Sequence, residues 1–263
     1  MNIRRNKQPT KYQDLLKALV SSGQSFFSFD DIRRITEKAN LSLKDTRSAV
    51  STLVLRGLIH SVKRDLYMLD WIVSGHPISE FEIATHLAQP SAISHFSAFY
   101  IHELTDQIPN TIFVSVPTGT SLPRVGKGKL FTYKGVRYRF IAVRKEHFFG
   151  LEYIQRSDAR IQVIDLERTL LDGLIRPKYC GGFSEVLHAF SISDFDIKKI
   201  IDYALRLDAS VAKRLGWVLE KFNYNGAEID RLFALPFKGY AKLNPSGEKK
   251  GPYNKRWHIQ ENI

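Results

Sequence analysis

The sequence predicts an α+β protein with a small helical domain at the N-terminus and a larger domain that mixes strands and helices. Its 263 residues exceed the usual length of a single domain. Apolar residues make up 43% of the chain and charged residues 25%, which is enough for packed cores. The hydrophobic spacing is helical over residues 1–57, mixed in the middle of the chain, and helical again from residue 184.

Residues 1–75 are predicted to contain three short helices followed by a β-hairpin. A hydroxyl residue suited to an N-cap precedes each helix, at Thr10, Ser28 and Ser42. Gly57 ends the third helix. Two strands, 59–62 and 66–69, then flank a tight turn at 63–65. This order of elements is typical of a winged helix-turn-helix domain, in which the hairpin is the wing.

The third helix has one apolar stripe and one face that is small, polar and cationic. Such a face fits the major groove of DNA, where Arg and Lys reach guanine or phosphate and short hydroxyl side chains allow close approach. The stripe expected to face the core comprises Leu43, Thr46, Val50, Leu53 and Val54. The face expected to bind DNA comprises Lys44, Arg47, Ser48, Ser51 and Thr52.

The charge of the chain points to the same kind of partner. The net charge is +12, and residues 1–75 hold 13 basic and seven acidic residues, so half of the excess lies in this segment. Further DNA contacts are expected from Arg4 and Arg5 in an N-terminal arm, and from Lys63 and Arg64 at the tip of the wing. The alternative is a winged helix that binds only proteins.

Residues 76–263 are predicted to form the larger domain. It mixes strands and helices to about residue 183, is helical over 184–235, and ends in an extended tail. The expected elements before residue 183 are a helix over 91–104, a buried strand over 110–117, a hairpin over 131–140, and a strand over 161–164 that leads into a helix begun by Asp165.

A second basic region lies within this domain. Residues 107–145 contain eight Lys and Arg residues and no Asp or Glu. On the second strand of the predicted hairpin, Arg137 and Arg139 alternate with apolar residues and so share one face. With Lys129 and Lys134 they form a possible second surface for nucleic acid, including RNA. The alternative is a solvated outer face of a sheet.

One pattern resembles a catalytic motif. Gly181–Gly182 is followed by Asp194-Phe-Asp196, as in nucleotidyltransferases that bind magnesium through paired carboxylates on a strand. However, the residues after Asp196 have helical spacing, so we expect Asp194 to cap a helix and Asp196 to lie in its first turn. A magnesium-dependent nucleotidyltransferase or nuclease that uses these two residues remains the enzymatic alternative.

The sequence predicts no catalytic residue, metal site or cofactor. The single cysteine, Cys180, excludes a disulfide within the chain and any zinc site built on paired cysteines. The basic start is not followed by the apolar segment of a signal peptide, and no stretch approaches 18 apolar residues. We therefore expect a cytoplasmic protein that does not contact membranes.

An ordered set of segments across nearly the whole chain resembles the AbiE-type antitoxin family, the antitoxins of type IV toxin–antitoxin systems of abortive phage infection. No single segment is specific, but their order is. One departure is Glu103, where the family pattern predicts glycine. After the predicted winged helix, the matching segments are Ser94–Pro109, Val163–Asp172, Arg176–Gly182, Arg214–Glu220 and Arg256–Trp257.

The resemblance implies a non-enzymatic antitoxin that also represses its own operon. The winged helix would bind inverted repeats in the operator DNA, and the larger domain would counter a toxin that resembles a nucleotidyltransferase. In type IV systems a stable complex between antitoxin and toxin is not assumed. A ligand-gated winged-helix transcription factor is a further alternative.

Overall fold

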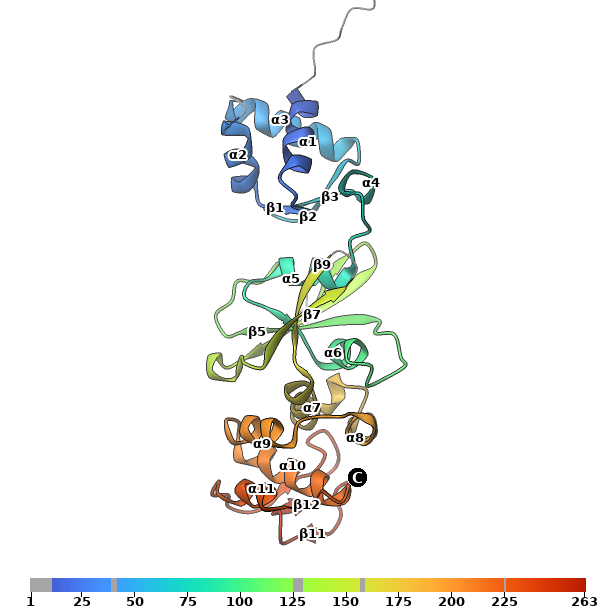
Figure 1. The fold of residues 1–263 in the computed structure, drawn as a ribbon, viewed down its shortest axis with the longest axis vertical. Helices are drawn as coiled ribbons and strands as arrows, with labels where there is room; N and C mark the ends of the chain where they lie inside the picture. The colour runs from blue at the N-terminus through green and yellow to red at the C-terminus, as the bar shows by residue number, and fades with distance from the viewer. Residues whose placement is uncertain (1–10, 39–41, 125–129, 157–158, 225) are drawn as a thin grey trace, which may run out of the picture. The chain divides into compact units, whose positions relative to one another are not determined.

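A computed structural model describes residues 11–38, 42–124, 130–156, 159–224 and 226–263 of the chain (Figure 1). The fold belongs to the α+β class, as predicted. The chain divides into two compact units, Met1–Ser79 and Glu80–Ile263, whereas the sequence suggested a boundary at residue 75. Among the described residues, no helix combines the length and the apolar character that a membrane span requires.

The smaller unit packs three helices around one apolar core beside a three-stranded sheet of order β1-β3-β2. The helix starts predicted at Ser28 and Ser42 are confirmed. Ser28 Oγ accepts a hydrogen bond from the backbone N–H of Asp31 (3.1 Å), and Ser42 Oγ accepts one from that of Asp45 (3.2 Å). The elements are α1 (Lys11–Ser21), β1 (Phe26–Phe27), α2 (Phe29–Glu37), α3 (Leu43–Leu55), β2 (Ile59–Lys63), β3 (Leu66–Leu69) and α4 (Trp71–Ser74).

The buried stripe of α3 differs in part from the predicted one. Leu43 and Val54 were expected in the core, but they are 47% and 36% exposed. The stripe is centred between Thr46 and Leu53, so Leu43 and Val54 lie at its edge. Ala49, which the prediction omitted, lies inside it. The buried residues of α3 are Thr46, Ala49, Val50 and Leu53.

The larger unit is built on a six-stranded mixed sheet of order β6-β7-β5-β4-β9-β8. Strands β5 and β7 are parallel, and β6 and β7 form an antiparallel hairpin. The turn of this hairpin lies at Lys134–Gly135, as predicted. The strands are β4 (Ala92–Ile93), β5 (Thr111–Pro117), β6 (Leu130–Tyr133), β7 (Val136–Val143), β8 (Leu151–Arg156) and β9 (Ala159–Ile164).

The predicted helix over 91–104 is wrong at its start. Ala92–Ile93 is a short strand, β4, because it bridges β5 and β9 in the sheet. The helix begins only at His95, which has a left-handed backbone (φ 53°). After the helix ends, Glu103 is also left-handed (φ 58°). Glycine suits such a position best, and glycine is the residue that the sequence resemblance led us to expect there.

Helix α7 is the centre of the larger unit. Its N-cap is Asp165, as predicted, with Oδ1 accepting from the backbone N–H of Arg168 at 3.0 Å. The helix packs against α6, α8, α9 and α10, and Figure 1 shows it between the sheet and the C-terminal helices. The helices of the unit are α5 (Glu80–Leu87), α6 (His95–Ile101), η1 (Lys145–His147), α7 (Leu166–Ile175), η2 (Pro177–Tyr179), α8 (Phe183–Ile192), α9 (Ile197–Leu205), α10 (Ala209–Lys221), α11 (Ala227–Asp230) and η3 (Arg231–Phe233).

The C-terminal segment is not an extended tail, as the sequence suggested. It folds back as a small sheet of order β10-β12-β11, and Trp257 is completely buried. The Trp257 ring stacks on Phe233 with 4.3 Å between ring centroids, and a Cβ atom at Gly216 of α10 would overlap it. Burial of one large aromatic ring therefore anchors the segment. Its strands are β10 (Ala241–Lys242), β11 (Tyr253–Asn254) and β12 (Ile259–Gln260).

Candidate nucleic-acid interface

Helix α3 is held so that its polar face points away from the core of the smaller unit. Its buried Thr46 hydroxyl lies 3.1 Å from the Thr36 hydroxyl of α2 and 3.0 Å from the carbonyl oxygen of Ser42, and the contact with Thr36 joins α2 to α3. Val50 and Leu53 pack into the core formed with α1 and the sheet. The orientation of α3 therefore depends on one buried polar contact and one apolar stripe.

The predicted DNA-binding residues of α3 lie together on the outward face. Lys44, Arg47, Ser48 and Ser51 are exposed, and Thr52 is half-buried. Within the described chain, neither cation forms an ion pair with a carboxylate; Arg47 lies 5.8 Å from the centroid of the Phe29 ring. The two positive charges are therefore available to an external anion.

The hydroxyl groups of this face are already used as donors. Ser51 Oγ donates to the carbonyl of Arg47 at 3.0 Å, and Thr52 Oγ1 donates to that of Ser48 at 2.9 Å. Their oxygen lone pairs remain, so in these rotamers both side chains can only accept hydrogen bonds. In the major groove, the donors that they could meet are the amino groups of cytosine and adenine.

An acidic residue adjoins the face but is neutralised. Asp45 lies 2.7 Å from Lys11 Nζ, and Ser42 Oγ donates to its carboxylate at 2.8 Å. The hydrogen bonds from Lys11 and Ser42 hold the pKa of Asp45 below its ordinary value. Asp45 thus stays ionised but its charge is balanced by Lys11, and the outward face remains cationic.

The two predicted cations of the hairpin differ in exposure. Lys63, expected at the wing tip, is half-buried at the end of β2, and burial lowers its pKa. Arg64 is exposed in the turn. Asp65, beside it, is left-handed (φ 60°), and its Oδ1 accepts from the backbone N–H of Phe29 at 2.8 Å. The tip is therefore tied to the start of α2, and Arg64 is its accessible cation.

The N-terminal arm and part of the second basic region lie outside the described residues. This applies to Arg4, Arg5 and Lys129. Lys134 is exposed at the turn of the β6–β7 hairpin.

Arg137 and Arg139 share a face of β7, but their surroundings differ. Arg137 is exposed. Arg139 is half-buried, with its guanidinium carbon 5.7 Å from the centroid of the Tyr179 ring. Ile141, next on that face, is only 5% exposed. The C-terminal part of this face is therefore the wall of a pocket, whose other cations, Arg176 and Lys178, the sequence analysis did not single out as binding residues.

The paired aspartates do not lie on a strand. Asp196, rather than Asp194, is the N-cap of α9, where its Oδ1 accepts from the backbone N–H groups of Lys198 (2.8 Å) and Lys199 (3.1 Å). These bonds lower the pKa of Asp196. No group of three His, Cys, Asp or Glu side chains in the described chain is arranged to hold a metal ion.

The carboxylates of Asp165 and Glu167, close together in the sequence, connect helix α7 to helix α9. Lys199 Nζ of α9 lies 2.7 Å from Glu167 and 3.2 Å from Asp165. Burial opposes ionisation of Lys199, but its contacts with these two carboxylates outweigh burial and raise its pKa. Burial likewise opposes ionisation of Glu167, and the bonds from Lys199 and the backbone of Asp196 still lower its pKa. The group therefore has a structural role.

Comparison with known proteins gives a structural likeness but no sequence match. No protein-family model and no curated protein sequence matches the chain. The crystal structure of the RV2827C protein from Mycobacterium tuberculosis is similar, with a TM-score of 0.63 over 95% of this chain and 91% of that chain. The two sequences are 13% identical, so the likeness concerns the fold alone.

Proposed function

We propose that this protein is a DNA-binding antitoxin that represses its own operon. The observation that carries the DNA-binding part is the outward face of α3, where Lys44 and Arg47 stand unpaired beside short hydroxyl side chains on an otherwise folded three-helix unit. A face of this shape and charge suits the major groove.

The arrangement of the smaller unit supports this proposal. Three helices precede a hairpin, and β1, between α1 and α2, pairs with β3 of the hairpin. This connectivity supports our proposal that the smaller unit is a winged helix-turn-helix domain in which α3 serves as the recognition helix. Lys44, Arg47, Ser48 and Ser51 would contact bases, while Arg64 and the arm with Arg4 and Arg5 would contact phosphates.

The antitoxin part rests on the resemblance to the AbiE-type family. Its ordered segments fall on elements that hold the larger unit together: Val163–Asp172 enters the central helix α7, and Trp257 closes the C-terminal segment. In this proposal the larger unit counters a nucleotidyltransferase-like toxin, and a stable complex with that toxin is not required. The protein acts in the cytoplasm and is not itself an enzyme.

The enzymatic alternative is weakened by the surroundings of the paired aspartates. Asp196 already accepts two backbone hydrogen bonds at the start of α9, and Asp194 precedes it in a segment without strand structure. A magnesium site would need both carboxylates directed at one ion. A nucleotidyltransferase activity of this chain is therefore not the function that we propose.

A gel-shift titration tests the DNA-binding part. The purified full-length protein is titrated against DNA from upstream of its own operon and against a scrambled duplex, at 50 and 200 mM salt. We expect preference for the upstream DNA at both salt concentrations, because base contacts persist when phosphate contacts are screened. Equal binding of both duplexes that is lost at higher salt would contradict base recognition.

A double variant locates the interface. Replacing Lys44 and Arg47 by Ala should abolish the sequence-specific shift, since two contacts of about 1–3 kcal/mol each would be lost. The matched control removes two exposed lysines of the same unit outside α3, Lys17 and Lys38. If the α3 variant and the control bind the upstream DNA equally well, the assignment of α3 as the recognition helix is wrong.

A further inference from the structure

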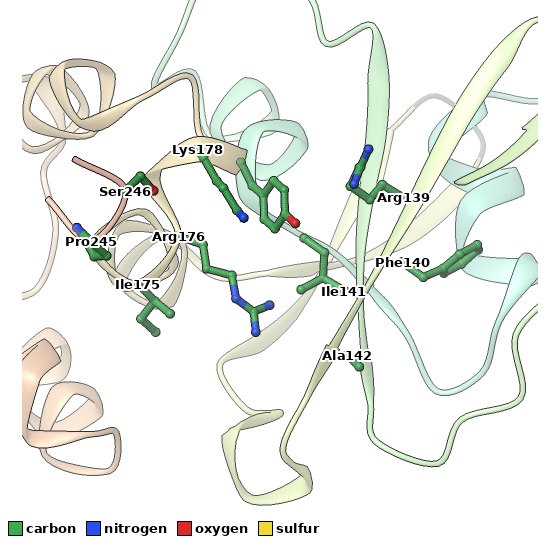
Figure 2. A pocket seen from close by; sticks show the side chains of 10 residues that line it. Arg139, Phe140, Ile141, Ala142, Ile175, Arg176, Lys178, Pro245 and Ser246 are labelled. Atoms are coloured by element: carbon green, nitrogen blue, oxygen red, sulfur yellow. The ribbon is translucent and has the colours of Figure 1, made fainter. Parts of the chain in front are cut away.

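A pocket of about 450 Å³ in the larger unit is lined by three cations from three separate elements. In Figure 2, Arg176 and Lys178 come from the helical side of the pocket and Arg139 from the strand on the other side. Arg176 ends α7, Lys178 lies in η2, and Arg139 lies in β7. The fold therefore gathers at one concave site charges that are about 40 positions apart in the sequence.

The charge of this pocket is not balanced by the protein. No Asp or Glu lines it. None of Arg139, Arg176 and Lys178 forms an ion pair in the described part of the chain, whereas nearby Arg144 pairs with Asp208 (2.6 Å) and Arg168 pairs with Asp172. Arg139 and Arg176 are half-buried, and neither has a carboxylate partner among the described residues. An anionic ligand would supply the missing charge.

The shape and the aromatic content of the pocket narrow the class of ligand. Tyr179 lies between the cations, with Lys178 Nζ 5.0 Å and the Arg139 guanidinium carbon 5.7 Å from its ring centroid. The adjoining cavity of about 310 Å³, which shares Ala142, Ile175 and Arg176, is also lined by Asp172 and Asp208, each paired with an arginine, so the anion site is confined to the first pocket. The 450 Å³ of that pocket exceeds the volume of a single phosphate, and an aromatic wall with cations suits a nucleotide.

We propose that this pocket binds the phosphate groups of a free nucleotide, a nucleoside di- or triphosphate, through Arg139, Arg176 and Lys178. Guanidinium groups bind phosphate oxygens in pairs of hydrogen bonds, and Lys178 adds a mobile point charge at the exposed rim. The three cations converge on one pocket rather than following a groove, which favours a small ligand over a nucleic-acid strand. All residues that line this pocket belong to the larger unit, so the proposed site shares no residue with the proposed DNA-binding face of α3.

Equilibrium binding of fluorescent mant-ATP and mant-GTP to the full-length protein tests the site. Saturable binding by the wild type is expected, with competition by unlabelled triphosphates. Arg139→Gln and Arg176→Gln should each weaken binding about tenfold or more, because each removes a hydrogen-bonded charge pair. The matched control is Arg137→Gln, which removes the same charge from an exposed position two residues along β7, outside the pocket.

The outcomes separate this pocket from general attraction to a basic protein. Absence of binding by the wild type at 1 mM nucleotide would overturn the proposal, as would an equal loss of affinity in Arg137→Gln. Displacement of the nucleotide by an unrelated single-stranded oligonucleotide at micromolar concentration, with inorganic pyrophosphate ineffective, would also overturn it, in favour of a strand-binding surface. Because Lys44 and Arg47 are untouched in these variants, an intact DNA shift distinguishes failure here from failure of the proposed function.

Discussion

Helices α3 and α7 use charged residues in opposite ways. Both are capped by a side chain that accepts from the third backbone N–H, Ser42 in α3 and Asp165 in α7. On α3, Lys44 and Arg47 are exposed and form no ion pair within the described residues. On α7, Arg168 and Asp172 are buried and paired, with side chains 3% and 5% exposed.

This contrast separates charges that act on a partner from charges that maintain the fold. A buried ion pair must stay matched, because a charge left alone in the interior costs several kcal/mol. An exposed cation is hydrated in both the folded and the unfolded chain, so it contributes little to the free energy of unfolding. The effect of a substitution on stability should therefore be large in α7 and small in α3, and the effect on DNA binding should be the reverse.

Breaking the buried Arg168–Asp172 pair should lower stability most. Asp172→Ala leaves the Arg168 guanidinium unpaired in the interior, so the free energy of unfolding should fall by about 3–5 kcal/mol. Denaturant unfolding of the full-length protein measures this loss. The matched control, Asp30→Ala, removes an exposed carboxylate of α2 that lies 3.6 Å from Arg33, and should cost less than about 1 kcal/mol.

A double variant tests whether the unpaired charge is the cause of this loss. Replacing both members of the pair, as Arg168→Met with Asp172→Leu, removes the unpaired charge and should recover stability relative to Asp172→Ala. If Asp172→Ala is no less stable than Asp30→Ala, the pair does not hold α7 in the way that we describe.

A smaller effect is expected from acidification of the larger unit. Burial lowers the pKa of both His86 and His95 to about 4. The unfolded chain takes up these protons near the ordinary pKa of 6.5, so stability is complete above that pH and falls as the pH decreases from 6.5 towards 4. For fully buried His95, the loss by pH 5 should be about 2 kcal/mol.

Denaturant unfolding at each pH measures this loss. It is followed by the fluorescence of Trp217 and Trp257, both in the larger unit, in a Trp71→Phe background that removes the tryptophan of the smaller unit. His95→Asn should make the pH dependence shallower, because asparagine cannot be protonated and tolerates the left-handed backbone at this position. A slope between pH 7 and 5 that is identical in the variant would show that His95 does not contribute.

The smallest effect on stability is expected on α3. Replacing Lys44 and Arg47 by Ala should change the free energy of unfolding by about 0.5 kcal/mol or less, since both side chains are exposed and α3 keeps its cap and its buried stripe. The same denaturant experiment measures it. A loss of 2 kcal/mol or more would mean that these cations maintain the fold, and a lost DNA shift could then no longer be assigned to direct contacts.

Local sequence signals predicted much of the fold correctly. N-caps at Ser28, Ser42 and Asp165 were confirmed because the capping hydrogen bond joins residues only three positions apart. The turn at Lys134–Gly135 was confirmed for the same reason. The helix predicted over 91–104 was wrong at its start because pairing with distant strands outweighs the local helical spacing. Ala92–Ile93 joins the sheet between β5 and β9 instead of the following helix.

The α+β class, the caps at Ser28, Ser42 and Asp165 and the cationic face of α3 could be predicted from the sequence, since the caps and the face depend on residues within one or two turns of each other. Which charges are free became visible only in the folded chain. It pairs Arg168 with Asp172 in the interior, ties Asp65 of the hairpin to the start of α2, and brings Arg139 to the pocket of Arg176 and Lys178. The physical reason is that burial and pairing of a charge depend on groups far away in the chain, which no local pattern reports.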